Sequence, residues 1–360
     1  MNKEVIKKRV GTICRELNKK RINCLVLTKP ANVTYATGFL GDDSWAVIAK
    51  GRVYLLTDSR YTEQAHKECP SCKIIDRAGP MAEALAKFLK RLKSMRTVTV
   101  EESTSLADFG RLQKTVKARL RTVANVIETV RSIKDTGETA TIRTAAAISS
   151  RALEQTLPYI KPGVTESELA GMLDFQIRKL GDRNSFETIV AFGPNASRPH
   201  HQPGKRMLRK KDTVLIDFGA RHKGYCSDIT RCFVIGGMTA FYKKVYDVVE
   251  QAQAAAIQMV RAGVKITQVD AAAREVIGKN GLPVYGHGTG HGFGLEIHES
   301  PFLKVEGKGT LKAGQVITIE PGIYMPGRLG VRIEDDVLVT ETGYKILTSK
   351  CPHSPLLPPT

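Results

Sequence analysis

The sequence predicts two domains of different classes, an α/β domain over residues 1–132 followed by an α+β domain over residues 133–360. Two observations lead to this prediction. Strand and helix patterns alternate through the first 130 residues, whereas the later part holds a faint internal repeat, and each copy leads to a pair of acidic residues on apolar strands. The 360 residues are enough for about two domains with substantial cores.

The first domain begins with an amphipathic helix over residues 1–21, which lacks the continuous apolar core of a signal peptide. Four apolar segments rich in β-branched residues then predict strands, and a segment of helical periodicity lies between the last two. The strands are 22–27, 45–50, 52–58 and 97–102, and the helix is MAEALAKFLKRLK. We expect a mixed or partly parallel sheet. Residues 131–140 mark the boundary, because apolar periodicity pauses there before a new helix at about 138–160.

The positive charge of the chain is concentrated in this first domain. The net charge is +19, and residues 1–130 hold 25 Lys and Arg against 13 Asp and Glu, a difference of +12. Such a charge can attract nucleic acid or acidic partners. The basic residues are nevertheless spread among apolar helix positions, without interleaved aromatic residues or a nucleic-acid motif. We interpret them as a solvated basic surface and expect no nucleic-acid partner.

Cysteine usage and hydropathy indicate a cytoplasmic location. Seven cysteines, an odd number scattered through a large chain, favour reduced thiols over a disulfide framework. Cys69-Pro-Ser-Cys72, with His66 upstream, could bind zinc or form a redox pair, but no second CxxC completes a four-ligand site, so ordinary thiols are favoured. No run of about 18 apolar residues predicts a membrane span.

The second domain contains a repeat of about twenty residues. Residues 161–181 and 261–281 both carry Gly-Val before an amphipathic helix, and both end in glycine. Thr165 with Glu168 forms a predicted capping box, and Thr267 is the predicted cap of the second helix. Each repeat is followed, 36 and 39 residues after its last glycine, by an acidic pair. The simplest arrangement is two related helix–helix–hairpin halves about a pseudo-two-fold axis, and the alternative is a chance resemblance of two amphipathic helices.

The two acidic pairs are predicted to face each other across β-hairpins. Asp217 and Asp228 flank the polar turn RHKG, whereas Glu320 and Glu334 flank Gly327. Residues directly opposite in an antiparallel pair have Cβ atoms about 4.5–5.5 Å apart, where like charges are destabilising. Two such pairs on apolar strands need a compensating cation. Neighbouring carboxylates are the ligands that hard divalent metals prefer, so the pattern indicates a metal site.

Four histidines bracket these carboxylates. His287, His291 and His298 lie between the two hairpins, and His200 lies 17 residues before Asp217. A lone histidine is usually a solvated or core residue, but four of them around four carboxylates favour a metal or catalytic role. The glycines beside the first three let the backbone approach closely and argue against a helix.

The segments IDFGA, SDITR, HGTGHGFGLEIHE, IEPGIY and VRIEDD resemble the pita-bread metallopeptidases, particularly aminopeptidase P and prolidase, over roughly residues 185–345. The first domain is similar, more weakly, to the creatinase-type N-terminal domain of those enzymes. The resemblance therefore implies a creatinase-like domain followed by a pita-bread catalytic domain. It also implies a homodimer.

The resemblance implies two divalent metal ions held by five residues. Asp217 would bind one ion, His291 and Glu320 would bind the other, and Asp228 and Glu334 would bridge them. An oxygen-rich site with one imidazole suits Mn²⁺ first, with Co²⁺, Fe²⁺ or Zn²⁺ as alternatives.

The remaining roles are also implied by the family. Glu320 would act as the general base, His298 and His200 would contact the carbonyl oxygen or the tetrahedral intermediate, and His287 would help line the proline side. His201 competes with His200, but the family's register favours His200. Arg332 would orient the bridging carboxylates or Tyr324, with a surface strand arginine as the alternative.

The first functional hypothesis is an Xaa-Pro aminopeptidase acting on proline-containing peptides. A bond to proline lacks the amide N–H, so ordinary peptidases handle it poorly. The alternatives are an Xaa-Pro dipeptidase and a non-catalytic binding module of the same fold. The sizeable first domain argues against a methionine aminopeptidase, and the intact ligand set argues against creatinase and against the binding module.

Overall fold

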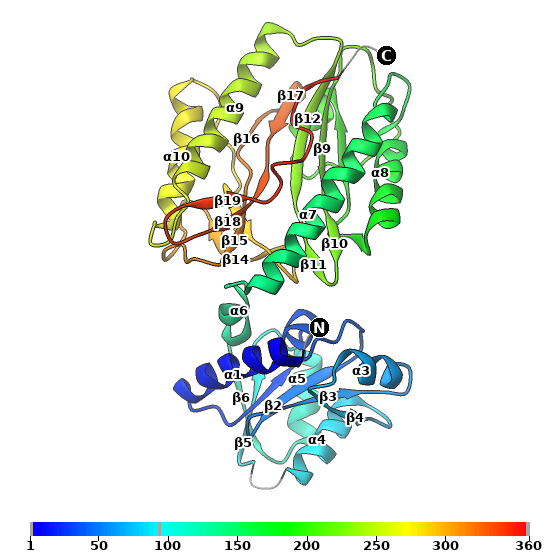
Figure 1. Cartoon of the computed structure of the whole chain (residues 1–360), viewed down its shortest axis with the longest axis vertical. Helices are drawn as coiled ribbons and strands as arrows, with labels where there is room; N and C mark the ends of the chain where they lie inside the picture. The colour runs from blue at the N-terminus through cyan, green and yellow to red at the C-terminus, as the bar shows by residue number, and fades with distance from the viewer. Residues whose placement is uncertain (1–2, 93–94, 358–360) are drawn as a thin grey trace. The chain divides into compact units, whose positions relative to one another are not determined.

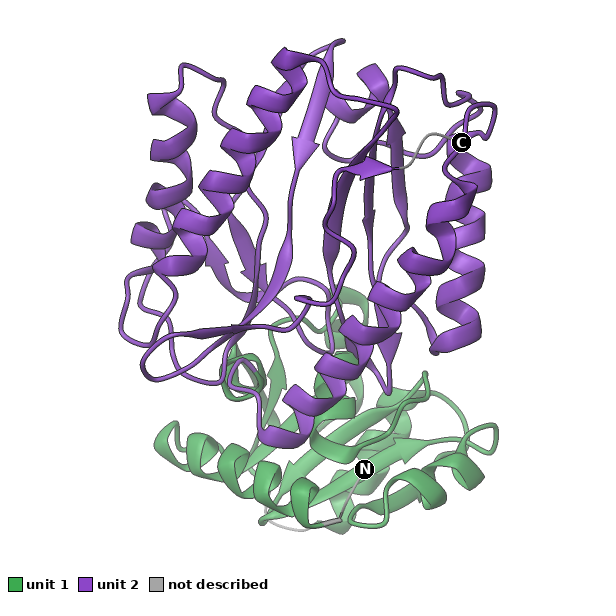
Figure 2. Ribbon diagram, turned by 45° about the horizontal axis from the view of Figure 1, so that its top comes forward, with its two compact units in different colours: residues 1–131 green, residues 132–360 purple. Residues whose placement is uncertain are grey.

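The computed structural model describes residues 3–92 and 95–357, which form two compact units, 1–131 and 132–360 (Figure 2). The expected domain limit lies one residue away from the limit between the units. Among the helices of the described ranges, none has the length and apolar character needed to cross a membrane.

Unit 1 is built on one mixed six-stranded sheet in the order β4-β3-β2-β1-β5-β6. The pairs β1–β5, β5–β6 and β3–β4 are parallel, and the pairs β1–β2 and β2–β3 are antiparallel, so the sheet is mixed, as expected. Its elements are α1 (Lys3–Lys19), β1 (Cys24–Leu27), α2 (Pro30–Thr37), β2 (Trp45–Ala49), β3 (Arg52–Thr57), α3 (Thr62–Glu68), β4 (Lys73–Asp76), α4 (Met81–Arg91), β5 (Thr97–Glu101), α5 (Leu106–Thr115), β6 (Arg119–Val123) and α6 (Val126–Arg131).

One face of this sheet is covered by α4 and α5. Val98 and Val100 of β5 pack there with Leu85 and Phe88 of α4 and Leu112 of α5. The short elements α2, α3, α5 and α6 and the edge strands β4 and β6 were not predicted. In β6 only Leu120 packs against this core, so the strand carries little apolar pattern.

Unit 2 contains two helix pairs, α7 with α8 and α9 with α10, on opposite sides of its strands (Figure 1). Its elements are α7 (Thr136–Thr156), η1 (Leu157–Tyr159), α8 (Glu166–Leu180), β7 (Arg183–Asn184), β8 (Ile189–Phe192), η2 (Gly193–Ser197), β9 (Thr213–Phe218), β10 (Ala220–His222), β11 (Tyr225–Cys226), β12 (Ile229–Ile235), α9 (Ala240–Gln258), α10 (Ile266–Lys279), β13 (Gly290–Gly292), β14 (Glu299–Leu303), β15 (Val316–Ile319), β16 (Gly322–Met325), β17 (Leu329–Arg332), β18 (Asp335–Val339), β19 (Tyr344–Ile346) and β20 (Leu356–Leu357).

The two helix pairs begin their inner helices in the same way. The N–H of Gly163 donates to the carbonyl of Leu208 at 2.9 Å, and the N–H of Gly263 donates to the carbonyl of Leu311 at 2.9 Å. Leu208 and Leu311 each donate in return, at 2.8 Å, to the valine after the glycine. The repeat seen in the sequence therefore corresponds to a repeated backbone arrangement. Each copy packs on its own core, α7 and α8 against β9 and β12, and α9 and α10 against β15 and β18.

The cap of α10 differs from the prediction. Thr165 caps α8 and forms the expected capping box with Glu168, but α10 begins after Lys265, so Thr267 lies inside its first turn. The backbone N–H of Lys265 donates to Gln268 Oε1 at 3.1 Å. Lys265 occupies the position of Thr165 when the Gly-Val pairs are aligned, so the repeat itself was the better guide to this helix start than the residue type.

The first acidic hairpin has a different register from the one predicted. Its tip is Lys223-Gly224, both at positive φ (47° and 86°), so Asp217 pairs with Thr230 instead of Asp228. The turn lies one residue later than expected, and each one-residue shift of a turn moves the cross-strand partner by two. Asp217 and Asp228 are therefore diagonal neighbours.

The second acidic hairpin has the predicted register. Ile319 pairs with Asp335 and Gly322 pairs with Arg332, which places Glu320 opposite Glu334 between two separate ladders. Pro321, which has no N–H to donate, comes directly after Glu320 at this interruption. Gly327 forms the tip at φ 69°.

Candidate active site

A cavity of about 520 Å³ in unit 2 brings nine of the ten predicted site residues together. They come from both halves of the unit: His200, Asp217 and Asp228 from the first, and His287, His291, His298, Glu320, Arg332 and Glu334 from the second. Tyr324, the tenth, contacts two of them. The nine residues that line the cavity span 135 positions of the chain.

His291 presents one ring nitrogen to two carboxylates. It lies on β13, and a Cβ at the preceding Gly290 would come within 1.9 Å of the Thr318 carbonyl oxygen, so only glycine allows this close strand approach. His291 Nδ1 lies 3.1 Å from the Gly292 carbonyl oxygen, which can only accept, so the proton is on Nδ1. Its Nε2 lone pair then faces Asp228 Oδ2 at 3.6 Å and Glu320 Oε1 at 3.4 Å.

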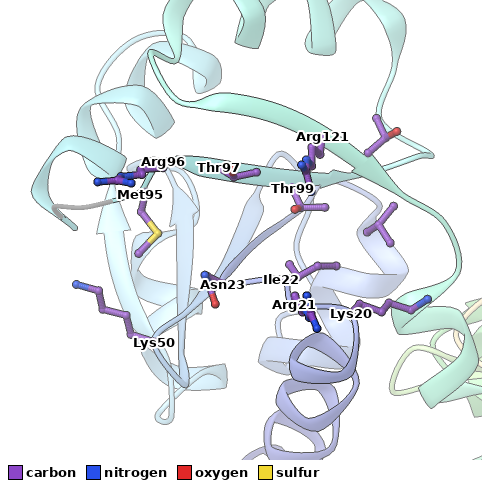
Figure 3. Close-up of a pocket in the computed structure, with 12 residues that line it drawn as sticks. Lys20, Arg21, Ile22, Asn23, Lys50, Met95, Arg96, Thr97, Thr99 and Arg121 are labelled. Carbon is purple, nitrogen blue, oxygen red and sulfur yellow. The ribbon is translucent and has the colours of Figure 1, made fainter.

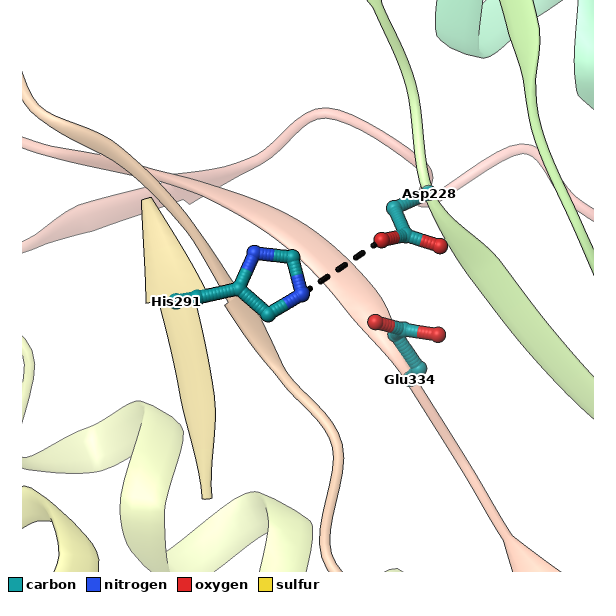
Figure 4. A group of neighbouring side chains, drawn as sticks. All are labelled: Asp228, His291 and Glu334. Atoms are coloured by element: carbon teal, nitrogen blue, oxygen red, sulfur yellow. Dashed lines mark ion pairs between the residues drawn. The ribbon is translucent and has the colours of Figure 1, made fainter. Parts of the chain in front are cut away.

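This arrangement favours a cation between the groups. Burial lowers the pKa of His291 to about 4, so the ring is neutral at pH 7 and cannot itself pair with the carboxylates. Ligand atoms of Asp228, His291 and Glu334 all lie within 4.8 Å of one another, and all three residues are buried (Figure 4). An unprotonated imidazole nitrogen beside two carboxylates is a donor set that fits a divalent metal.

The carboxylates of the cavity repel one another. Burial, and then the charges of Glu334 and Asp217, raise the pKa of Asp228 well above its ordinary value. Burial, and then Glu320 and Asp217, raise the pKa of Glu334 in the same direction. Burial also raises the pKa of Glu320 to about 7, against the opposing effect of Arg332. Without added positive charge, these groups hold protons instead of ionising.

Arg332 forms an ion pair with one carboxylate of the cavity. Its Nη2 lies 2.6 Å from Asp217 Oδ2, and its Nη1 donates to Tyr324 Oη at 2.8 Å. Arg332 is 3% exposed, so the alternative of a surface arginine is wrong. Asp217 Oδ1 is buried and has no hydrogen-bond partner among the described residues. That free oxygen fits a role as metal ligand.

His287 is fixed by a chain of hydrogen bonds that begins at Arg332. His287 Nδ1 lies 2.7 Å from the Gly288 carbonyl oxygen and must carry the proton, so Nε2 accepts from Tyr324 Oη at 3.1 Å. Burial lowers the pKa of His287 to about 4. The ring is therefore neutral, and its orientation depends on the same arginine that contacts Asp217.

His298 and His200 lie at the open side of the cavity. The ring of His298 is 4.4 Å from that of His291, centroid to centroid, and the residue is exposed. His200 is exposed, whereas its neighbour His201 is buried and lies 2.9 Å from Glu166 Oε2. The two adjacent histidines thus point to different environments, and His200 is the one available to a ligand.

Two threonines hold the carboxylates and were not predicted. Thr230 Oγ1 donates to Glu334 Oε2 at 2.7 Å and accepts from Arg332 Nε at 3.1 Å. Thr318 Oγ1 donates to Glu320 Oε1 at 3.2 Å and accepts from the His291 N–H at 3.0 Å. Each threonine lies two residues from an acidic residue, so strand alternation was a signal that could have found them.

Glu166 was also missed. It is fully buried at the start of α8 and accepts from four groups: the N–H of Phe192, Asn195 Nδ2, His201 and the N–H of Gly204. It thereby holds both ends of the segment that carries His200. No local pattern could reveal this contact, because Glu166 and His201 are 35 residues apart.

Comparison with known proteins identifies the family. Residues 140–341 match metallopeptidase family M24, and residues 9–133 match the creatinase/prolidase N-terminal domain. The chain belongs to metallopeptidase family M24. It is 38% identical to the uncharacterized peptidase YqhT of Bacillus subtilis over 337 residues, 93% of this chain and 94% of that protein.

Solved structures agree with this family. An Xaa-Pro dipeptidase from Bacillus anthracis superimposes with a TM-score of 0.93 at 34% identity, covering 98% of this chain and 100% of that one. An X-Pro aminopeptidase from Thermotoga maritima gives 0.89 at 35% identity, covering 96% and 99%. The predicted combination of a creatinase-type N-terminal domain and an M24 catalytic domain is confirmed, and the protein is a metallopeptidase. Membership implies divalent metal ions, which the donor set of the cavity fits.

Proposed function

We propose that this M24 peptidase is an Xaa-Pro aminopeptidase, which uses two divalent metal ions to hydrolyse the bond between an N-terminal residue and proline. One observation carries the metal part of the proposal. A cavity lined by Asp217, Asp228, Glu320 and Glu334, two of them buried and two half-buried, also directs the lone pair of a neutral His291 ring at two of them. Arg332 pairs with only one of these carboxylates.

The five ligands divide unequally between the two ions. Asp217, whose Oδ1 has no hydrogen-bond partner among the described residues, would hold one ion, His291 and Glu320 would hold the other, and Asp228 and Glu334 would be shared between them. Four carboxylates against two dications leave the cluster near neutrality, which removes the repulsion that otherwise raises the pKa values of these groups. Mn²⁺ is the first choice for an oxygen-rich site, with Co²⁺, Fe²⁺ or Zn²⁺ as alternatives.

When bound, such ions supply a water of lowered pKa and positive charge for the developing oxyanion. Glu320, whose carboxylate lies in the cavity beside His291, would serve as the general base. His298 and His200 face the open side, where they donate to the carbonyl oxygen of the substrate. His287 is held neutral and rigid by Tyr324 and lines the proline side. Arg332 fixes Asp217 and Tyr324 in place.

An Xaa-Pro dipeptidase is the second candidate, and one residue favours it. Lys304 lines the cavity and, apart from the buried Arg332, is the only Lys or Arg among its described lining residues. A dipeptide would bring its terminal carboxylate close to the reacting bond, where an exposed ammonium group can attract it. The Bacillus anthracis relative, named as an Xaa-Pro dipeptidase, supports the same alternative.

The experiment compares two substrates on protein first freed of metal and then loaded with Mn²⁺. We expect no hydrolysis without metal, and release of the first residue from an Xaa-Pro-Yaa tripeptide after loading. Hydrolysis of Xaa-Pro but not of Xaa-Pro-Yaa would establish the dipeptidase instead. If neither substrate is cleaved by the Mn²⁺-loaded or Co²⁺-loaded protein, the proposed function is wrong.

A further inference from the structure

Unit 1 contains a second cavity that the peptidase chemistry does not use. Its volume is about 760 Å³, within the range of about 300–1,000 Å³ typical of small-ligand sites. It opens on the sheet face opposite to α4 and α5. Val98 and Val100 of β5 point into the core beneath those helices, so Thr97 and Thr99, which alternate with them, point into the cavity.

The rim of this cavity is strongly cationic. Five basic side chains from four separate segments line it: Lys20 and Arg21 after α1, Lys50 between β2 and β3, Arg96 before β5, and Arg121 of β6. None of the described lining residues is Asp or Glu. Figure 3 shows these basic side chains together with Asn23, Thr97 and Thr99, which also line the cavity.

Most of these charges have no counter-ion within the described residues. Arg21, Arg96 and Arg121 make no ion pair there, and Lys50 Nζ donates to a neutral acceptor, the Leu92 carbonyl oxygen, at 2.8 Å. The nearest carboxylate to Lys20 along α1 is Glu16, and that group already pairs with Lys19 at 2.7 Å. Like charges gathered around one cavity repel each other, and an anion between them would relieve that repulsion.

The donors suit phosphate oxygens. Arginine presents a planar set of N–H groups that binds phosphate through paired hydrogen bonds, and lysine adds a point charge. Arg121 is the cross-strand partner of Thr99, so a guanidinium and a hydroxyl stand side by side on the same sheet face. Thr99 is 5% exposed, so it belongs to the buried part of the cavity lining.

The lining also indicates the size of the ligand. No Phe, Tyr or Trp is among the described residues that line the cavity, so it offers no aromatic platform on which the bases of a single-stranded nucleic acid could stack. We propose that this cavity of unit 1, rimmed by Lys20, Arg21, Lys50, Arg96 and Arg121, binds a small polyphosphate anion. This site is separate from the peptidase cavity, and its test does not depend on the proposed function.

The test is calorimetric titration of the metal-free full-length protein with sodium tripolyphosphate, compared with two double variants. Arg21→Gln with Arg121→Gln removes two charges of the rim, whereas Lys87→Gln with Lys90→Gln removes two exposed charges of α4 on the other face of the sheet. We expect saturable binding of one anion per chain, weakened about tenfold or more by the first pair and changed less than about twofold by the second.

Three results would overturn the proposal: no binding of tripolyphosphate, equal weakening by both double variants, or binding of single-stranded RNA without binding of tripolyphosphate. Equal weakening would mean that the overall charge of the chain, +19, attracts the anion without a site. Thermal unfolding of each variant checks folding, and Arg121→Gln alone, at an exposed position of an edge strand, serves if the double variant does not fold. The single variant is expected to bind several-fold more weakly than the unsubstituted protein.

Discussion

The first half of unit 2, built on α7 and α8, and the second half, built on α9 and α10, begin their inner helices with the same backbone hydrogen bonds. They differ in the residue directly after the helix cap. In the first half that residue is Glu166, which is buried and holds the His200 segment, whereas in the second half it is Ile266, which packs in the apolar core. The two copies of the repeat share the backbone arrangement at the helix start. They differ in the side chains that they carry at equivalent positions.

The two acidic hairpins differ in the same sense. Glu320 and Glu334 stand directly opposite each other, whereas Asp217 and Asp228 are diagonal, and Arg332 from the second half pairs with Asp217 of the first. The histidine in the cluster of close ligand atoms, His291, also comes from the second half. Neither half has a complete site, so the proposed metal cluster depends on both.

The largest effect is expected from removing one bridging carboxylate of each half. Asp228→Asn and Glu334→Gln should each lower kcat/KM about a thousandfold or more, because a divalent ion supplies several kcal/mol of charge stabilisation. Each should also lose metal, measured by elemental analysis after dialysis. Asp247→Asn, at an exposed position of α9, is the control and should retain full activity. A variant that lost activity but kept both ions would contradict the bridging assignment.

The threonines that hold the carboxylates should have the next largest effect. Thr230→Val leaves Glu334 and Arg332 without a shared hydroxyl, and Thr318→Val does the same to Glu320 and the His291 N–H. We expect each to weaken metal binding about 10- to 100-fold, with the fold retained. Competition with a coloured chelator measures this. Unchanged metal affinity in either variant would show that the threonine replaced there does not hold its carboxylate in place.

The pH dependence of stability isolates Glu320. Its pKa in the folded, metal-free protein is about 7, raised from 4.5, so the folded state binds the proton more tightly than the unfolded state. The stabilisation is therefore complete below pH 4.5 and is lost as the pH rises towards 7. Urea unfolding should show the metal-free protein losing stability relative to Glu320→Gln across this window. The loss should be of the order of 1–3 kcal/mol. A difference that is independent of pH would contradict the raised pKa.

A substitution of Glu166 tests whether this residue, which has no acidic counterpart in the second half, holds the His200 segment. Glu166→Gln replaces one acceptor oxygen by a donor among four donors, and we expect a loss of about 1–3 kcal/mol in the free energy of unfolding. KM should rise more than kcat falls, since the His200 segment is displaced. Glu168→Gln, an exposed position on the same helix, should cost less than about 1 kcal/mol. Equal losses in the free energy of unfolding of the two variants would contradict a particular role for Glu166.

The smallest effect separates the two candidate activities. If the ammonium group of Lys304 binds the terminal carboxylate of the substrate, Lys304→Gln should raise KM for an Xaa-Pro dipeptide about fivefold. The KM for the corresponding Xaa-Pro amide, which lacks that carboxylate, should not change. Lys308→Gln, exposed in the same loop, is the matched control. An unchanged KM for the dipeptide would favour the aminopeptidase.

The sequence predicted the parts of the fold that depend on short-range patterns. The hairpin around Gly327 has the predicted register, because a glycine at its centre marks the turn. In the first hairpin the predicted cross-strand partner of Asp217 was wrong by two residues. The polar segment RHKG does not reveal that Lys223 and Gly224 both have positive φ. The contact of Glu166 with His201 depends on tertiary packing over 35 residues, which no local pattern reveals.

Diffraction from Mn²⁺-loaded crystals, with anomalous maps at the manganese edge, tests the central claim most directly. We predict two peaks about 3.5–4 Å apart, one beside Asp217, the other beside His291 and Glu320, and both in contact with Asp228 and Glu334. A single peak, or peaks away from these five side chains, would contradict a dinuclear site shared by the two halves.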